Sequence, residues 1–244
     1  MSFDNRYNNN WMNTAGSKGL VEQKASKIIA GVYGWMSLGV LISALVGFSL
    51  VGSGAMMTLL QAGTGLVMGL FIVQLGLVFG MSFAANKMSS STLKGLFLLY
   101  SAITGVTFGI ILLVYTLESV ISIFFVAAFA YAALAAFGAI TKKNLGFMGT
   151  FLMMGLVMVI GVGIVNLFVH SELLSKLSGW IGIIVFSGLT AYDSQRIRDN
   201  SIEISYSGDV AMSQRFMILG ALTMYLNFFN LFISLLQIFG GRRD

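Results

Sequence analysis

The sequence contains no cysteine and no proline, and it has only one histidine, His170, among its 244 residues. Without cysteine, the chain can form no disulfide, no thiolate metal site and no cysteine nucleophile. Without proline, a kinked helix would need glycine or an inserted polar group. Haem and zinc also lack their usual histidine and cysteine ligands. We therefore expect no cofactor.

Charge is also scarce. Asp, Glu, Lys and Arg make up 9% of the residues, whereas they make up about 25% of a typical soluble domain. Hydrophobic residues reach 57%, and a water-soluble fold could not bury that much apolar surface. A bilayer accepts it, because one helical span needs only about 20 apolar residues. The composition predicts an integral membrane protein.

Stretches without charge mark the spans, because an ionised side chain at the bilayer centre costs about 2.5 to 3.5 kcal/mol. The first such stretch, 28–86, is too long for one helix and contains glycines that permit a turn, so it must cross twice. We expect an all-α integral membrane protein in which 28–244 forms a single domain of seven transmembrane helices. The spans are expected at about 29–51, 65–86, 95–116, 119–140, 146–169, 176–195 and 216–239.

Basic residues in short loops predict the orientation, because they are retained on the cytoplasmic side. With the N-terminus inside, eleven of the fourteen Lys and Arg residues are cytoplasmic, and only Lys176, Arg242 and Arg243 lie outside. These residues are scattered and form no patch for nucleic acid. Residues 1–27 are polar and lack the apolar stretch of a signal peptide, so we expect a disordered cytoplasmic tail.

One acidic residue, Asp193, is expected within a span, near the cytoplasmic end of the sixth. The uncharged stretch from 177 to 192 is too short to cross the bilayer alone, so the span must include residues on either side of it. Asp193 is then either a functional ionisable group that faces the bundle interior, or an interfacial carboxylate that pairs with Arg196. The candidates for a counter-charge at the same rim are Arg196, Lys87, Lys94 and Lys142.

Polar and small residues in the seventh span recur every three or four positions, which places them on one helical face. A helix that faces only lipid does not need such a face. The face either lines a polar path or packs against neighbouring helices. We expect Asn227, about half-way along it, to meet a residue of an adjacent span. The face consists of Gly220, Thr223, Asn227, Asn230, Ser234 and Gln237.

The sequence also argues against an enzyme. His170 lies at the outer edge of the fifth span, where we expect a solvated residue rather than the base of a serine protease. An intramembrane aspartyl protease needs two facing carboxylates, but no second aspartate falls in a span, since Asp209 belongs to a loop. The last span has no lysine for a retinal Schiff base. Two classes of function therefore remain, a cation channel and an interaction protein.

Two long motifs resemble a known family. Gly188–Ile197 reads GLTAYDSQRI, and Gly220–Gly240 reads GALTMYLNFFNLFISLLQIFG. Both resemble the Bax inhibitor family, in particular its bacterial branch, and the seven-span layout with a short polar tail extends the resemblance over essentially the whole chain. The resemblance implies a last helix at the centre of the fold, wrapped by the other six. It also implies a pH-sensitive calcium leak in a bacterial inner membrane.

The resemblance further implies a pair of aspartates, one from each motif, that shares protons and sets the closed or open state. Asp193 matches the first aspartate, whereas Asn227 stands at the position of the second. Two carboxylates in contact cannot both ionise cheaply, but an amide does not titrate. We therefore expect a gate or ion path at Asp193, Asn227, Asn230 and Thr223, with a weakened or displaced pH response. Calcium contact at Asp193 would be weak and transient.

Some bacterial relatives are regarded as modulators of a membrane-anchored ATP-dependent protease, which gives a second expectation. In that case, the polar tail, 1–27, would be the segment that a partner recognises. The two expectations are separable. A channel predicts that Asp193→Ala changes ion flux in lipid alone, whereas an interaction protein predicts that deletion of the tail changes the stability of the partner.

Overall fold

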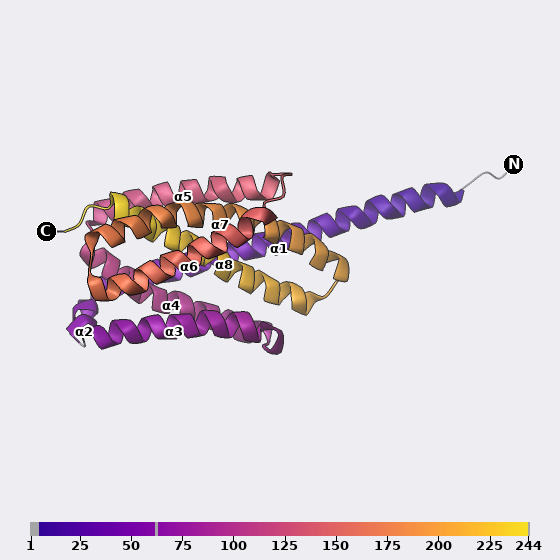
Figure 1. Cartoon of the computed structure of the whole chain (residues 1–244). Coiled ribbons are helices and arrows are strands. Elements are labelled where there is room, and N and C mark those ends of the chain that lie inside the picture. Colours follow the sequence, from indigo (N-terminus) through magenta and orange to yellow (C-terminus); the bar gives the residue numbers. More distant parts are fainter. Residues whose placement is uncertain (1–4, 62, 244) are drawn as a thin grey trace.

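The computed structural model describes residues 5–61 and 63–243, which form a bundle of α-helices (Figure 1). Seven helices in this part of the chain are long and apolar enough to cross a membrane, which confirms the expected fold class. The helices are α1 (Asn5–Gly52), α2 (Ala55–Gln61), α3 (Thr64–Ala84), α4 (Ser90–Val114), α5 (Leu117–Ile140), α6 (Gly146–Val169), α7 (Glu172–Ser207) and α8 (Val210–Phe239), with a short 3-10 helix at Ala85–Lys87.

The last two helices are longer than the spans expected from the sequence. α7 continues to Ser207 and α8 begins at Val210, whereas we expected the spans to end near 195 and to begin near 216. Charged residues mark the edge of the bilayer core, but they do not end a helix. The turn between the two helices is made by Gly208, whose φ of 69° suits glycine, and by Asp209, whose side chain accepts from the backbone NH of Met212.

α1 begins at Asn5 and passes as a helix through residues 5–27 of the polar tail. The start of the tail, 1–4, lies outside the described residues. Extending an existing helix is easier than starting a new one, which carries a nucleation cost. The extension projects well beyond the bundle (Figure 1), and the side chains of Lys18 and Lys24 on it are exposed.

α8 occupies the centre of the bundle, as the resemblance implied. It packs against α1, α4, α5 and α7, whereas α3 packs mainly on α4 and α6 packs mainly on α7. α3 and α6 therefore form an outer layer. At the middle of α8, Tyr225 is fully buried and contacts Phe97 and Tyr100 edge to face, and its hydroxyl lies 2.6 Å from Ser43 Oγ. This cluster holds α1, α4 and α8 together.

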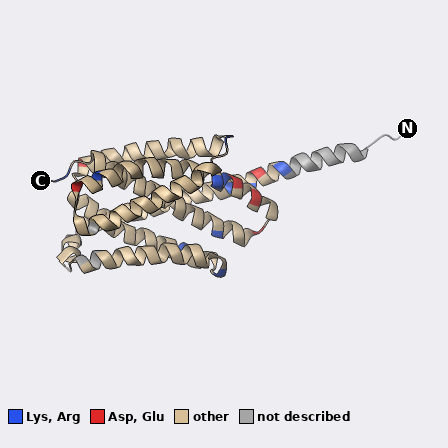
Figure 2. Cartoon of the chain, in the orientation of Figure 1, with Lys and Arg blue, Asp and Glu red and all other residues tan. Residues whose placement is uncertain are grey.

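Charged residues gather at the two ends of the bundle and leave its long sides nearly free (Figure 2). The α3–α4, α5–α6 and α7–α8 connections lie at the end from which α1 projects (Figure 1). The C-terminus lies at the opposite end, where Thr116 N donates to Gly241 O over 2.9 Å and Arg243 N donates to Val114 O over 2.9 Å. α8 therefore crosses the whole bundle.

Candidate functional site

Asp193 of α7 and Asn227 of α8 meet inside the bundle. Asn227 Nδ2 donates to Asp193 Oδ2 over 2.8 Å, and the two residues are 8% and 5% exposed. α8 thus brings the amide of one motif to the carboxylate of the other, across a separation of 34 residues in the sequence. The expected meeting of Asn227 with a residue of the adjacent span is present in this contact.

The residues considered as counter-charges form no ion pair with Asp193. Within the described residues, ion pairs join Lys176 to Glu172 and Arg198 to Asp199 only. Arg196, Lys87 and Lys142 are exposed, and Lys94 Nζ lies 5.8 Å from the ring centroid of Trp35. The interfacial alternative, in which Asp193 pairs with Arg196, therefore does not describe this structure. The carboxyl group is instead held in the interior by an uncharged partner.

The residues that follow Asp193 fasten α7 to its other neighbours. Ser194 Oγ donates to Ala135 O of α5 over 2.7 Å and lies 2.8 Å from the hydroxyl of Tyr33 in α1. Because the single hydroxyl proton of Ser194 is used on Ala135, Tyr33 is the donor to Ser194. Three helices thus meet at one serine beside Asp193.

Gln195 and Arg198 bind the connection between α5 and α6. Gln195 Oε1 accepts from Leu145 N, and Gln195 Nε2 donates to Lys143 O, both over 2.8 Å. Arg198 Nη1 donates to the carbonyl oxygens of Ala139 and Thr141, which lie at the end of α5. These bonds satisfy carbonyl groups that a helix end leaves without partners. Gln195 of the motif and Arg198 just after it therefore fasten α7, close to Asp193, to the end of α5 and to the α5–α6 connection.

The polar face of α8 divides into two kinds of residue. Thr223, Asn230 and Ser234 donate to backbone carbonyls one turn earlier in α8 itself, over 2.7 to 3.1 Å. Ser234 also lies against Gly182 of α7, where a side chain larger than glycine would collide with it. Within the described residues, Asn227 is the one member of this face whose side chain bonds to another helix. Ser234 and Gln237 pack closely against glycines of α7, whereas Gly220 lies closest to Val32 of α1.

The chemistry available at this site is limited. Ca²⁺ takes six to eight oxygen ligands in tight protein sites, at about 2.3 to 2.6 Å. The described residues contain no group of three or more His, Cys, Asp or Glu side chains that could hold a metal ion. A carboxyl group and an amide can stay hydrogen-bonded in both protonation states of the carboxyl group. The amide donates to the ionised carboxylate and accepts from the protonated carboxylic acid.

The sequence reasoning missed the tyrosines around the site. Tyr33 bonds to Ser194, and Tyr131 of α5 donates to Met224 O of α8 over 3.1 Å. The sequence did hold a signal for both residues, namely a tyrosine within an apolar span. A buried tyrosine hydroxyl in a span needs a hydrogen-bond partner. Their partners could not be named, since the contacts span separations of 161 and 93 residues.

These features define a polytopic helical membrane protein with a central last helix and one buried carboxylate contacted from that helix. Residues 25–244 match the family model described as "Inhibitor of apoptosis-promoting Bax1". Inner membrane protein YbhL of Escherichia coli strain K12 is 41% identical over 215 residues, which cover 88% of this chain and 92% of that protein. A protein of Borreliella burgdorferi is 36% identical over 219 residues, covering 90% of this chain and 94% of its own length.

The chain therefore belongs to the Bax inhibitor family, as its two motifs indicated, and it is a multi-pass inner membrane protein. The family match includes both motifs, the last six candidate spans and all but the first seven residues of the first, Lys18–Gly52. It begins at residue 25, so most of the N-terminal extension of α1 lies outside it.

Proposed function

We propose that the protein is a cation leak channel of the Bax inhibitor type, with calcium as the permeant ion and a modest dependence on pH. The observation that carries this proposal is the buried Asp193, whose carboxylate is bonded to Asn227 of the central helix over 2.8 Å. A carboxyl group in the interior of a membrane bundle is costly and marks an ion or proton path more often than a packing site. The seven-helix frame and the family membership agree with a channel rather than an enzyme.

The orientation proposed for the channel places the N-terminus in the cytoplasm. The connections that hold Lys87, Lys142 and Lys143 lie at the end from which α1 projects (Figure 1), and Arg198 of α7 bonds to the carbonyl oxygens of Ala139 and Thr141 at the same end. Lysines and arginines concentrate in cytoplasmic loops. In this orientation, the Asp193 contact lies in the cytoplasmic half of the bundle, and Thr223 and Asn230 flank Asn227 along α8. An ion would meet few protein oxygens there, which favours passage over retention.

The pH response follows from the amide at position 227. Two carboxylates at hydrogen-bond distance would titrate as a coupled pair, whereas an amide beside one carboxylate leaves a single titrating group. The Asp193–Asn227 contact can persist in both protonation states, because the amide has both a donor and an acceptor. The leak of the wild-type protein should therefore vary less steeply with pH than the leak of Asn227→Asp.

The test is calcium entry into liposomes that contain the purified protein and an enclosed calcium dye, from mildly acidic to mildly alkaline pH. We expect wild type to leak, Asp193→Ala to change the leak, and Asn227→Asp to steepen its pH dependence. Glu203→Ala is the matched control, because it removes an exposed carboxylate from the same helix. Calcium entry no faster than in empty liposomes for every variant would contradict the proposal.

A second candidate function is a membrane-embedded modulator of a membrane-anchored ATP-dependent protease. The observation that favours it is the helical extension of α1, which projects beyond the bundle and lies mostly outside the family match (Figure 1). A chain that lacks residues 1–24 separates the two functions. Both functions predict unchanged calcium entry for this truncation. The channel also predicts an unchanged half-life of the protease's substrates in cells, whereas the modulator predicts a changed half-life.

A further inference from the structure

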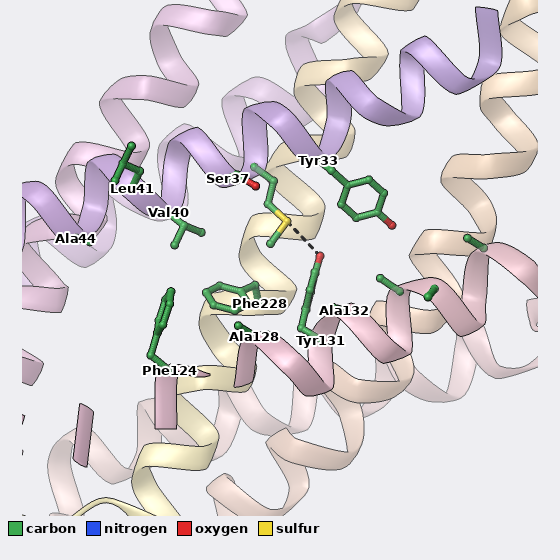
Figure 3. Close-up of a pocket in the computed structure, with 14 residues that line it drawn as sticks. Tyr33, Ser37, Val40, Leu41, Ala44, Phe124, Ala128, Tyr131, Ala132 and Phe228 are labelled. Carbon is green, nitrogen blue, oxygen red and sulfur yellow. Dashed lines mark hydrogen bonds between the residues drawn. The ribbon is translucent and has the colours of Figure 1, made fainter. Parts of the chain in front are cut away.

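A groove runs along one side of the bundle between α1 and α5. Its volume is about 640 Å³, and the aromatic ring of Phe228 from α8 belongs to its lining (Figure 3). One wall comes from Tyr33, Ser37, Val40 and related positions of α1, and the other from an alanine-rich face of α5. The α5 wall consists of Phe124, Ala128, Tyr131, Ala132, Ala135, Ala136 and Ala139.

The alanines explain why the groove exists. Five of them occupy the face of α5 that looks toward α1, and a methyl group fills far less space than the leucine or phenylalanine common elsewhere in this chain. Ala132 and Ala136 are exposed, so the groove is open toward the side of the bundle that meets hydrocarbon in a membrane. An open apolar groove in this position is filled by whatever the bilayer supplies.

The lining selects an apolar occupant. Its tyrosine hydroxyls already have partners, because Tyr33 bonds to Ser194 and Tyr131 donates to Met224 O. Figure 3 also shows the contact of Tyr131 with the sulfur of Met36, at 3.4 Å. Water needs two to four polar partners to remain in a cavity, and these walls offer few. A hydrocarbon chain needs none.

The length of the groove matches one leaflet. From Tyr33 to Ala44 on α1 the helix rises by about 16 Å, and from Phe124 to Ala139 on α5 it rises by about 22 Å, at 1.5 Å per residue. Half of a hydrocarbon core of about 30 Å is about 15 Å. The α1 wall is thus about as long as one leaflet and the α5 wall is somewhat longer, so one acyl chain fits within the groove. The leaflet is the one nearer to the projecting end of α1, because the groove reaches Ala139 at the end of α5 on that side.

The mouth of the groove at that end is basic. Ala139 lines the groove close to the end of α5 at Ile140, and the exposed Lys142 and Lys143 follow directly. Arg198 holds the carbonyl oxygens of Ala139 and Thr141, which fixes the backbone that leads to the two lysines. Neither lysine forms an ion pair within the described residues. Two free cations beside a chain-shaped apolar groove complement a phosphate on a hydrocarbon tail.

We propose that the α1–α5 groove binds one acyl chain of an anionic phospholipid, whose phosphate lies against Lys142 and Lys143. The bound chain fills the space between α1 and α5 next to the Tyr33–Ser194 hydrogen bond. Because Ser194 follows Asp193, the lipid stabilises the arrangement of helices around the buried carboxylate. The binding itself does not depend on whether the protein conducts ions.

The experiment is native mass spectrometry of the full-length protein in detergent, with added phosphatidylglycerol or phosphatidylcholine of identical acyl chains. Wild type is expected to retain one phosphatidylglycerol molecule with an affinity about thirtyfold higher than for phosphatidylcholine at low salt. This factor corresponds to the electrostatic attraction of two lysines for the anionic head group. The preference should fall as salt is raised. Lys142→Gln/Lys143→Gln changes exposed side chains only, and it should lose this preference while its melting temperature without lipid stays that of wild type.

Two tryptophan variants of α5 form a matched pair that tests the groove. Ala132→Trp fills the groove and should lose the retained lipid, whereas Ala133→Trp points away from the groove on the same helix and should keep it. Equal retention in the two tryptophan variants would overturn the assignment of the groove. Equal affinity of wild type for the two lipids would overturn the assignment of the head group to the lysines.

Discussion

Replacing Gly138 of α5 with alanine tests how closely α5 and α7 must approach for the site to form. A Cβ atom at position 138 would overlap the backbone oxygen of Ala191, two residues before Asp193, and backbone cannot move aside as a flexible side chain can. Overpacking of this kind costs about 1 to 3 kcal/mol. Separation of the helices would also weaken the Ser194–Ala135 hydrogen bond, worth about 0.6 kcal/mol in membrane proteins.

Gly161→Ala in α6 is the control, because nothing lies within 4 Å of the added methyl group. Both variants gain the same helix propensity, about 1 kcal/mol, so that gain cancels between them. Gly138→Ala should therefore unfold about 2 to 3.5 kcal/mol more easily than Gly161→Ala. The assay is reversible unfolding in mixed micelles with increasing SDS, followed by circular dichroism. Equal midpoints for the two variants would refute the inference that α5 and α7 touch at Gly138.

Three further substitutions test single contacts. Tyr33→Phe removes the donor to Ser194 and should lower the free energy of unfolding by about 0.6 kcal/mol in the SDS titration. Asn227→Leu leaves the buried Asp193 without its hydrogen-bond partner, which should cost about 1 to 3 kcal/mol, and an unchanged midpoint would contradict this. Gln74→Leu removes a 3.2 Å hydrogen bond from α3 to α4, so amide exchange should quicken in α3 and stay unchanged in α7.

The spans were predictable because the bilayer penalises charge strongly. Stretches without charge located all seven, and α5 and α6 match their expected ranges within two residues. The ends of α7 and α8 were not predictable in the same way, since Arg196, Arg198 and Arg215 are compatible with a helix outside the hydrocarbon core. α1 likewise extends into the polar tail, because a polar composition does not stop a helix that is already formed.

The site was predictable only in part. The short uncharged stretch from 177 to 192 singled out Asp193, and the spacing of polar residues on the last span singled out Asn227. That these two positions form a pair was implied only by the resemblance to the Bax inhibitor family, and the structure brings the two side chains together. The bonds of Ser194 to Ala135 and to Tyr33 depend on how three distant helices pack. The α1–α5 groove could not be predicted either, because its two walls come from helices about 90 residues apart in sequence. The alanine-rich face of α5 can be recognised in the sequence only after α1 is known to pack against it.

The central claim is that the charge of Asp193, rather than its packing, governs the leak. Asp193→Asn tests it most directly, because asparagine keeps the size of the side chain and an oxygen that accepts from Asn227, while it removes the ionisable group. Calcium entry into liposomes is measured for wild type and Asp193→Asn across the same range of pH. The account predicts that Asp193→Asn changes the rate and abolishes its pH dependence. Identical rates and identical pH profiles for the two proteins would contradict it.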